Sequence, residues 1–216
     1  MRKFLLFFIV LLTAGLLLTG CESDSTAPED ELPVLSDEDV ATQSGAMAAS
    51  MTQVFPRIWE PASGKDNGEY EYTFPGGSAV QGTVYSEFRD VEGGDLVDYD
   101  VAGWALVLTE DPLSITLLDG GIPWLLGFTI TADIDQAADE ATATGVGTLV
   151  VGDYNAAFTL DAVVVEDGDD YPASGSITFI NEGITAVVTF DGDNLVTVTV
   201  GEDSWTVDLD DGSIIS

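Results

Sequence analysis

The chain has 216 residues, 39 of them acidic and five basic, with no histidine. Its hydrophobic fraction of 45% is enough to bury a core, which excludes a disordered chain. The charge excludes nucleic acid as a partner, because such binding depends on basic contacts with phosphates. The missing histidine excludes imidazole catalysis and histidine-ligated zinc sites.

The few basic residues lie early in the chain, and the last of them is Arg89. The many acidic side chains beyond it must face water and counterions, so we expect cations to associate diffusely with this surface. Two interpretations stay open. The chain is a generally acidic exported protein, or it is adapted to high salt, because lysine-poor and acid-rich surfaces resemble those of halophilic proteins.

Residues 1–20 have the pattern of a signal peptide. Arg2 and Lys3 give a positive start, and an apolar run from Phe4 to Leu18 follows. The run is short for a permanent membrane span of about 20 residues, and no basic cluster follows to stop its transfer. We therefore expect export and removal of this segment rather than a transmembrane anchor.

The sequence Leu18-Thr19-Gly20-Cys21 ends this segment at the chain's single cysteine. It resembles the lipobox of bacterial lipoproteins, which has an aliphatic residue, two small residues and a cysteine. The resemblance covers residues 1–21 and implies cleavage before Cys21 and attachment of acyl chains to it. It thus implies lipid anchoring to the cell membrane or outer membrane of a bacterium. The mature domain matches no family that we can name from its sequence.

Two segments connect the lipobox to the rest of the chain. Residues 21–35 are rich in acids and proline and predict a flexible tether. Ser36, followed by three acids, predicts a helix N-terminus, and Pro56 predicts its end. Between them we expect an amphipathic helix over 36–56 that packs one apolar face, made of Val40, Met47, Met51, Val54 and Phe55.

Residues 57–216 change to a period of two. Apolar and polar residues alternate over 80–89, 154–164, 184–190, 196–200 and 205–210, which predicts strands with one wet face. Turn sequences such as Asn181-Glu182-Gly183 and Gly201-Glu202-Asp203 separate the last strands at hairpin spacing. We predict a mainly β fold in which an antiparallel meander forms an up-and-down barrel or a strongly curved sheet, with the helix packed against it. A β-sandwich is the alternative.

Carboxylates are the abundant reactive groups. A pair of them can hydrolyse glycosides, but no spacing among so many acids stands out. Calcium prefers oxygen ligands, and Asp191, Asp193, Asp208 and Asp210 are weak candidates to bind it. Asp-Gly and Asn-Gly sequences are also ordinary hairpin turns, so we favour turns at these four positions. A calcium-binding module and a glycosidase remain minor alternatives.

An apolar ligand is a further alternative. Trp104, Trp124 and Trp205 are weak candidates to line a pocket, since an open barrel can hold a small hydrophobic molecule. Core packing is the simpler explanation of these residues.

The sequence thus predicts a membrane-anchored envelope lipoprotein with a non-catalytic binding or structural role. It needs no cofactor, has no catalytic residues and binds no nucleic acid. We expect the membrane, through the acyl chains on Cys21, and a small apolar ligand or an envelope protein as partners. The alternative is a barrel-like carrier of an apolar ligand. A void lined by tryptophans would favour the carrier, and a packed interior would favour the structural module.

Overall fold

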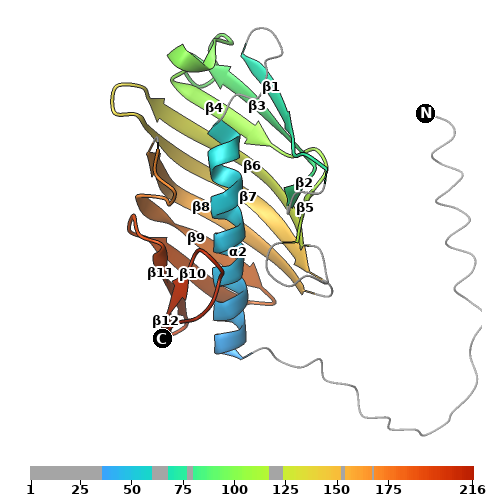
Figure 1. Cartoon of the computed structure of the whole chain (residues 1–216), viewed down its shortest axis with the longest axis vertical. Coiled ribbons are helices and arrows are strands. Elements are labelled where there is room, and N and C mark those ends of the chain that lie inside the picture. The colour runs from blue at the N-terminus through green and yellow to red at the C-terminus, as the bar shows by residue number, and fades with distance from the viewer. Residues whose placement is uncertain (1–35, 60–67, 77–79, 117–123, 152–153, 167) are drawn as a thin grey trace, which may run out of the picture. The chain divides into compact units, whose positions relative to one another are not determined.

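The structure is a computed structural model, and it describes residues 36–59, 68–76, 80–116, 124–151, 154–166 and 168–216 (Figure 1). These residues belong to one compact unit, Leu35–Ser216. The predicted signal peptide over 1–20, the lipobox and the tether over 21–35 lie outside the described residues. No helix within the described ranges is both long enough and apolar enough to cross a membrane.

One antiparallel sheet of 12 strands dominates the fold. Its main path follows chain order from β1 to β12, while the short β2 and β5 pair with each other beside β6. The strands are β1 (Glu69–Thr73), β2 (Val80–Gln81), β3 (Thr83–Arg89), β4 (Trp104–Leu108), β5 (Leu113–Ile115), β6 (Trp124–Asp135), β7 (Glu140–Val151), β8 (Tyr154–Glu166), β9 (Ser174–Asn181), β10 (Ile184–Phe190), β11 (Leu195–Val200) and β12 (Asp203–Asp208).

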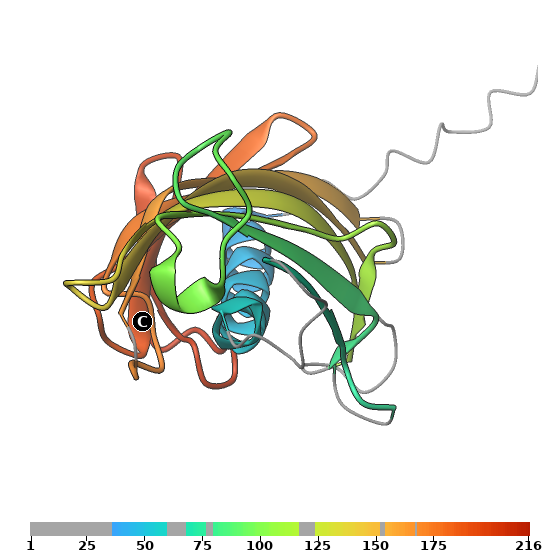
Figure 2. The same cartoon turned by 90° about the horizontal axis from the view of Figure 1, so that it is seen from above.

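The sheet curves strongly around the helix but does not close, because β1 and β12 stand at opposite ends of the strand order (Figure 2). The predicted antiparallel meander with a packed helix is therefore confirmed in its curved-sheet form, and the barrel does not close. The predicted turns at 181–183 and 201–203 connect β9 to β10 and β11 to β12. Short hairpins of this kind can only join antiparallel neighbours, which explains why spatial order follows chain order.

Helix α2 (Asp37–Trp59) begins where its N-cap predicts. The backbone N–H of Asp39 donates to Ser36 Oγ over 3.2 Å, and the Asp39 carboxylate accepts hydrogen bonds from the backbone N–H and the hydroxyl of Ser36. These hydrogen bonds lower the pKa of Asp39 below its usual value. The prediction that the helix ends at Pro56 is wrong, because α2 continues to Trp59. A proline removes one helical N–H donor, and here the helix continues past that loss.

The helix lies in the hollow of the sheet and packs against β10, β11 and β12 (Figures 1 and 2). The lack of a side chain at Gly45 permits this close approach, since a Cβ at that position would lie 2.9 Å from Cγ2 of Val207 on β12. On another side of the helix, a Cβ on Gly212 would lie 2.7 Å from Cα of Ala46. Glycine costs helix propensity elsewhere, but here Gly45 leaves room for the Val207 side chain, and Gly212 lets its own backbone approach Ala46.

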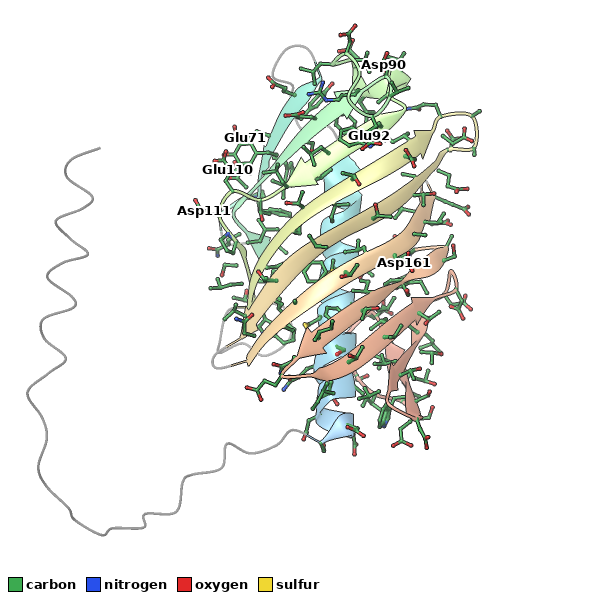
Figure 3. The ribbon with its side chains drawn as sticks, turned by 180° about the vertical axis from the view of Figure 1, so that it is seen from behind. Glu71, Asp90, Glu92, Glu110, Asp111 and Asp161 are labelled. Carbon is green, nitrogen blue, oxygen red and sulfur yellow. The ribbon has the colours of Figure 1, made fainter. Side chains whose placement is uncertain are left out.

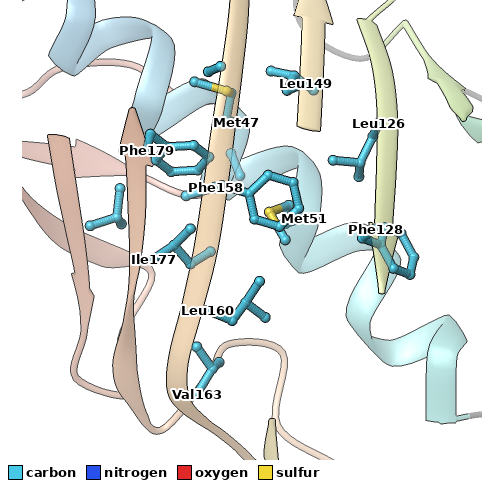
Figure 4. Close-up of a cluster of buried hydrophobic side chains, with 14 of the residues drawn as sticks. Met47, Met51, Leu126, Phe128, Leu149, Phe158, Leu160, Val163, Ile177 and Phe179 are labelled. Atoms are coloured by element: carbon cyan, nitrogen blue, oxygen red, sulfur yellow. The ribbon is translucent and has the colours of Figure 1, made fainter. Parts of the chain in front are cut away.

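A continuous apolar core fills the space between α2 and the concave face of the sheet (Figure 4). Met47 and Met51 of the helix belong to the same cluster as Phe158, Leu160 and the other inward side chains of the long strands. The rings of Phe158 on β8 and Phe179 on β9 lie 6.0 Å apart between centroids. Burial of this core is the main favourable term in folding, because it removes apolar surface from water.

A second, smaller apolar cluster lies at one end of β3 and β4. Phe88 and Ala105 are buried side by side on these strands, and the rings of Tyr70 and Tyr99 meet Phe88 edge-on. Tyr99 comes from η1 (Tyr99–Val101), a 3₁₀ turn in the long β3–β4 connection. This cluster anchors the connection to the sheet.

Candidate functional site

Of the four aspartates considered as calcium ligands, Asp191 and Asp208 accept turn hydrogen bonds through their carboxylates. Asp191 Oδ1 accepts a 3.4 Å hydrogen bond from the backbone N–H of Asp193 in the β10–β11 turn. Asp208 Oδ1, at the end of β12, accepts hydrogen bonds from the backbone N–H of Asp210 at 2.9 Å and from Asn194 Nδ2 at 3.3 Å. Carboxylates that receive such bonds from their own loops stabilise the turns.

No group of three or more acidic or cysteine side chains that could hold a metal ion occurs in the part of the chain that the structure describes. Asp210 is instead engaged with Tyr171, whose hydroxyl donates a short hydrogen bond to the Asp210 carboxylate. This bond, with smaller contributions from burial and from nearby carboxylates, raises the pKa of Tyr171 to about 12. It joins the β8–β9 connection to the segment that follows β12.

The Tyr171–Asp210 bond should make stability depend on alkaline pH. Because the pKa of Tyr171 is raised from 10.0 to about 12 on folding, its contribution is complete below pH 10.0 and is lost as the pH rises through about 12. Tyr171→Phe should remove this dependence and cost about 1 kcal/mol or less, since the pair is mostly exposed. Subtracting the ultraviolet tyrosinate titration of the variant from that of the wild type should leave one group near pH 12. A difference curve centred at pH 10 would contradict the bond.

The three candidate tryptophans do not meet. Trp104 lies on the outward face of β4, where it pairs with Arg89 and Asp133, while its neighbour Ala105 is buried. Trp124 is 8% exposed and belongs to the core at the start of β6. Trp205 lies on β12 at the far end of the sheet and packs partly buried against the core. Trp124 and Trp205 therefore pack in or against the core, and the three tryptophans do not line a common ligand site.

The interior of the curved sheet is packed with side chains. The largest fully buried ones include Phe88, Phe158 and Phe179, with Met47 of the helix among them. The buried polar residues within the described ranges are Ser44, Ser50, Thr52, Ser86 and Asn181, so none of the described carboxylates is buried. A glycosidase needs one carboxylic acid with a raised pKa, which burial normally supplies. The described interior therefore offers this chemistry no acid.

Arg89, the last residue of β3, is held by two acceptors. Its Nη2 donates to Glu87 Oε2 over 2.8 Å, and its Nη1 donates to the carbonyl oxygen of Gly94 over 2.7 Å. The guanidinium thus ties the acidic loop after β3 to the strand. A half-exposed ion pair of this kind contributes little to stability.

Many acids on the outside of the sheet stand at turns and strand ends, among them Asp90, Glu92, Glu110 and Asp111 (Figure 3). Glu71 lies within β1, and Asp161 lies in the middle of the outward face. The centre of this face carries threonines and serines in register across several strands. Sequence reasoning found the alternating threonines but not their alignment, because alignment depends on strand register.

Comparison of the chain with protein-family models, with curated proteins and with solved structures finds no match.

Proposed function

We propose that this protein is an exported, lipid-anchored envelope protein whose curved-sheet domain has a non-catalytic binding or structural role. The observation that carries the role is the packed interior. Helix α2 and inward aromatic side chains fill the hollow in which a carrier would hold its ligand. The surfaces left for function are the outside of the sheet and its loops.

The predicted signal peptide and lipobox over residues 1–21 support the proposed lipid anchor. Each buried methylene of an acyl chain contributes about 0.8 kcal/mol, and stable anchoring needs more than one chain. Acyl chains on Cys21 would meet this need without a protein helix in the bilayer. The tether over 21–35 would hold the domain away from an anionic membrane surface, which its own charge repels.

Replacing Cys21 by serine should abolish the lipid anchor, because the diacylglyceryl group that carries the acyl chains is attached to the cysteine sulfur. Labelling cells with an alkyne analogue of palmitate should mark the wild type and the matched variant Glu22→Gln, but not Cys21→Ser. The serine variant should leave the membrane fraction or retain residues 1–20. Equal labelling of both variants would contradict the proposal.

The acidic surface should make the domain more stable as salt rises. Folding of residues 36–216 gathers 34 of the 39 acids and three bases into a small volume, since the other five acids lie in the tether over 21–35, and salt screens the repulsion. The screening length falls from about 10 Å at 0.1 M to about 3 Å at 1 M salt. The melting temperature should therefore rise steadily with KCl, and calcium should add to it without a stoichiometric endpoint. A melting temperature that is flat with KCl, or calcium calorimetry that saturates at one or two tight sites, would contradict this account.

A further inference from the structure

The outward face of β6 to β12 carries two uncharged rows that run across the strands. We call these two rows the hydroxyl face. The first row is Thr129, Val146, Thr159, Thr178, Val187, Thr199 and Ser204, each paired with the next across neighbouring strands. The second row is Ser176, Thr189, Thr197 and Thr206. Neighbouring strands lie about 4.8 Å apart, so a side chain recurs along each row at that interval.

The hydroxyl face is a neutral surface on a strongly negative protein. Asp161 borders its second row, opposite Ser176, and the other acids of this region stand at turns and strand ends (Figure 3). Threonine suits strands, and like charges opposite each other destabilise a sheet. These two effects account for a strand surface of threonine. They also leave a surface on which Asp161 is the carboxylate that borders the two rows.

The face also exposes apolar groups beside its hydroxyls. Val146, the second member of the first row, is 59% exposed, and Ile180, two residues beyond Thr178 on the same face of β9, is 48% exposed. Threonine methyl groups lie between them. The surface therefore offers hydrogen-bonding and apolar contacts together, without charge.

The charge around the hydroxyl face and the shape of the face restrict the class of partner that can bind there. The acidic turns around the face repel polyanions, and a basic protein would be drawn to those turns rather than to the neutral rows. The face lies on the convex side of the sheet (Figure 2), and two convex faces match each other poorly in shape. A small molecule would find no hollow on a convex surface. An uncharged polymer that can follow the curve meets all these conditions.

We propose that the hydroxyl face binds a linear, uncharged polysaccharide, a partner class that rests on the binding role proposed above. Hydroxyl groups recur along such a polymer with each sugar. They recur on every strand of the second row and on five of the seven strands of the first row, where Val146 and Val187 take the other two places. Each threonine can donate one hydrogen bond and accept others, as a sugar hydroxyl can. The exposed Val146 and the threonine methyls contact the apolar faces of the sugar rings.

The test uses the full mature chain in a polyoxyethylene detergent, because a glycoside detergent would compete for the face. Affinity electrophoresis in gels that contain hydroxyethylcellulose or pullulan measures binding. The test variant combines Thr159→Val, Thr178→Val and Thr189→Val, which keep shape and strand propensity but remove three hydroxyls. The control combines Thr73→Val with Thr83→Val, whose hydroxyls bond to each other over 3.1 Å at the far end of the sheet.

The wild type and the control should be retarded by at least one polymer, and the triple variant should bind roughly tenfold or more weakly. Retardation should persist in molar KCl, since no charges take part. Failure of the wild type to bind either polymer, or equal binding by the triple variant, would overturn the proposal. A dimer in sedimentation that the triple variant loses would assign the face to a second copy instead. Loss of the acyl label on Cys21 would leave these results unchanged, so the two proposals can fail separately.

Discussion

Replacing Met51 by aspartate should destabilise the domain by about 3–5 kcal/mol, because it places an unpaired charge in a packed apolar core. Met51 is 3% exposed and belongs to the main core cluster between α2 and the sheet. For a domain of this size the loss corresponds to a fall in melting temperature of roughly 10 °C or more. The loss of stability relative to the wild type should become smaller at low pH, where protonation of the new aspartate removes its charge.

Thr42→Asp is the matched control, since it adds the same side chain to an exposed position of the same helix. It should change stability by about 0.5 kcal/mol or less. If Met51→Asp proves too unstable to purify, Met51→Ala should still show a loss of about 2–5 kcal/mol. Thermal melts of both Met51 variants that match the wild type would show that the helix does not pack in the sheet.

Gly147→Ala should cost about 1–3 kcal/mol, or more if the core cannot shift, since it overpacks the core. Gly147 lies on β7 between Phe128 and Phe158, to which it is paired on either side. A Cβ at this position would collide with the carbonyl oxygen of Gly127 and with the ring of Phe158. The backbone oxygen is held by the sheet, and the ring of Phe158 is buried in the main core cluster.

Gly127→Ala supplies the control on the neighbouring strand. A Cβ there would meet its nearest atom, Thr148 Oγ1, at 3.6 Å, which is an ordinary contact. This variant should be neutral or slightly stabilising, because alanine restricts the unfolded chain more than glycine does. Equal denaturation midpoints for the two alanine variants would contradict the packing of Phe158 over β7.

The alternation of apolar and polar residues predicts the later strands well, because each strand has one buried face and one solvent-exposed face. In β10, Ala186, Val188 and Phe190 are buried while Thr185 and Thr189 are exposed, as the alternation predicts. Local turn sequences then fix which strands are neighbours. Neither signal predicts whether the sheet closes, since closure depends on how strand tilt and stagger add up over the whole sheet.

The remaining features depend on contacts between distant residues. Gly45 reads in sequence as a weak point of the helix, and only its contact with Val207 of β12 explains it. Trp104 and Trp124 are equally apolar in sequence, yet one faces outward and the other belongs to the core. The alignment of Thr159, Thr178 and Thr199 likewise requires the register of four strands. The predicted helix end at Pro56 was wrong because local helix propensity takes no account of the tertiary packing of α2.

The mass of the native amino terminus tests the anchored-lipoprotein account most directly. Protein isolated from its own membranes is digested, and its amino-terminal peptide is measured by mass spectrometry. The account predicts that the mature chain begins at Cys21 and that this residue carries diacylglyceryl, with or without an acyl group on its new amino terminus. An unmodified Cys21, or a mature chain that still contains residues 1–20, would contradict it.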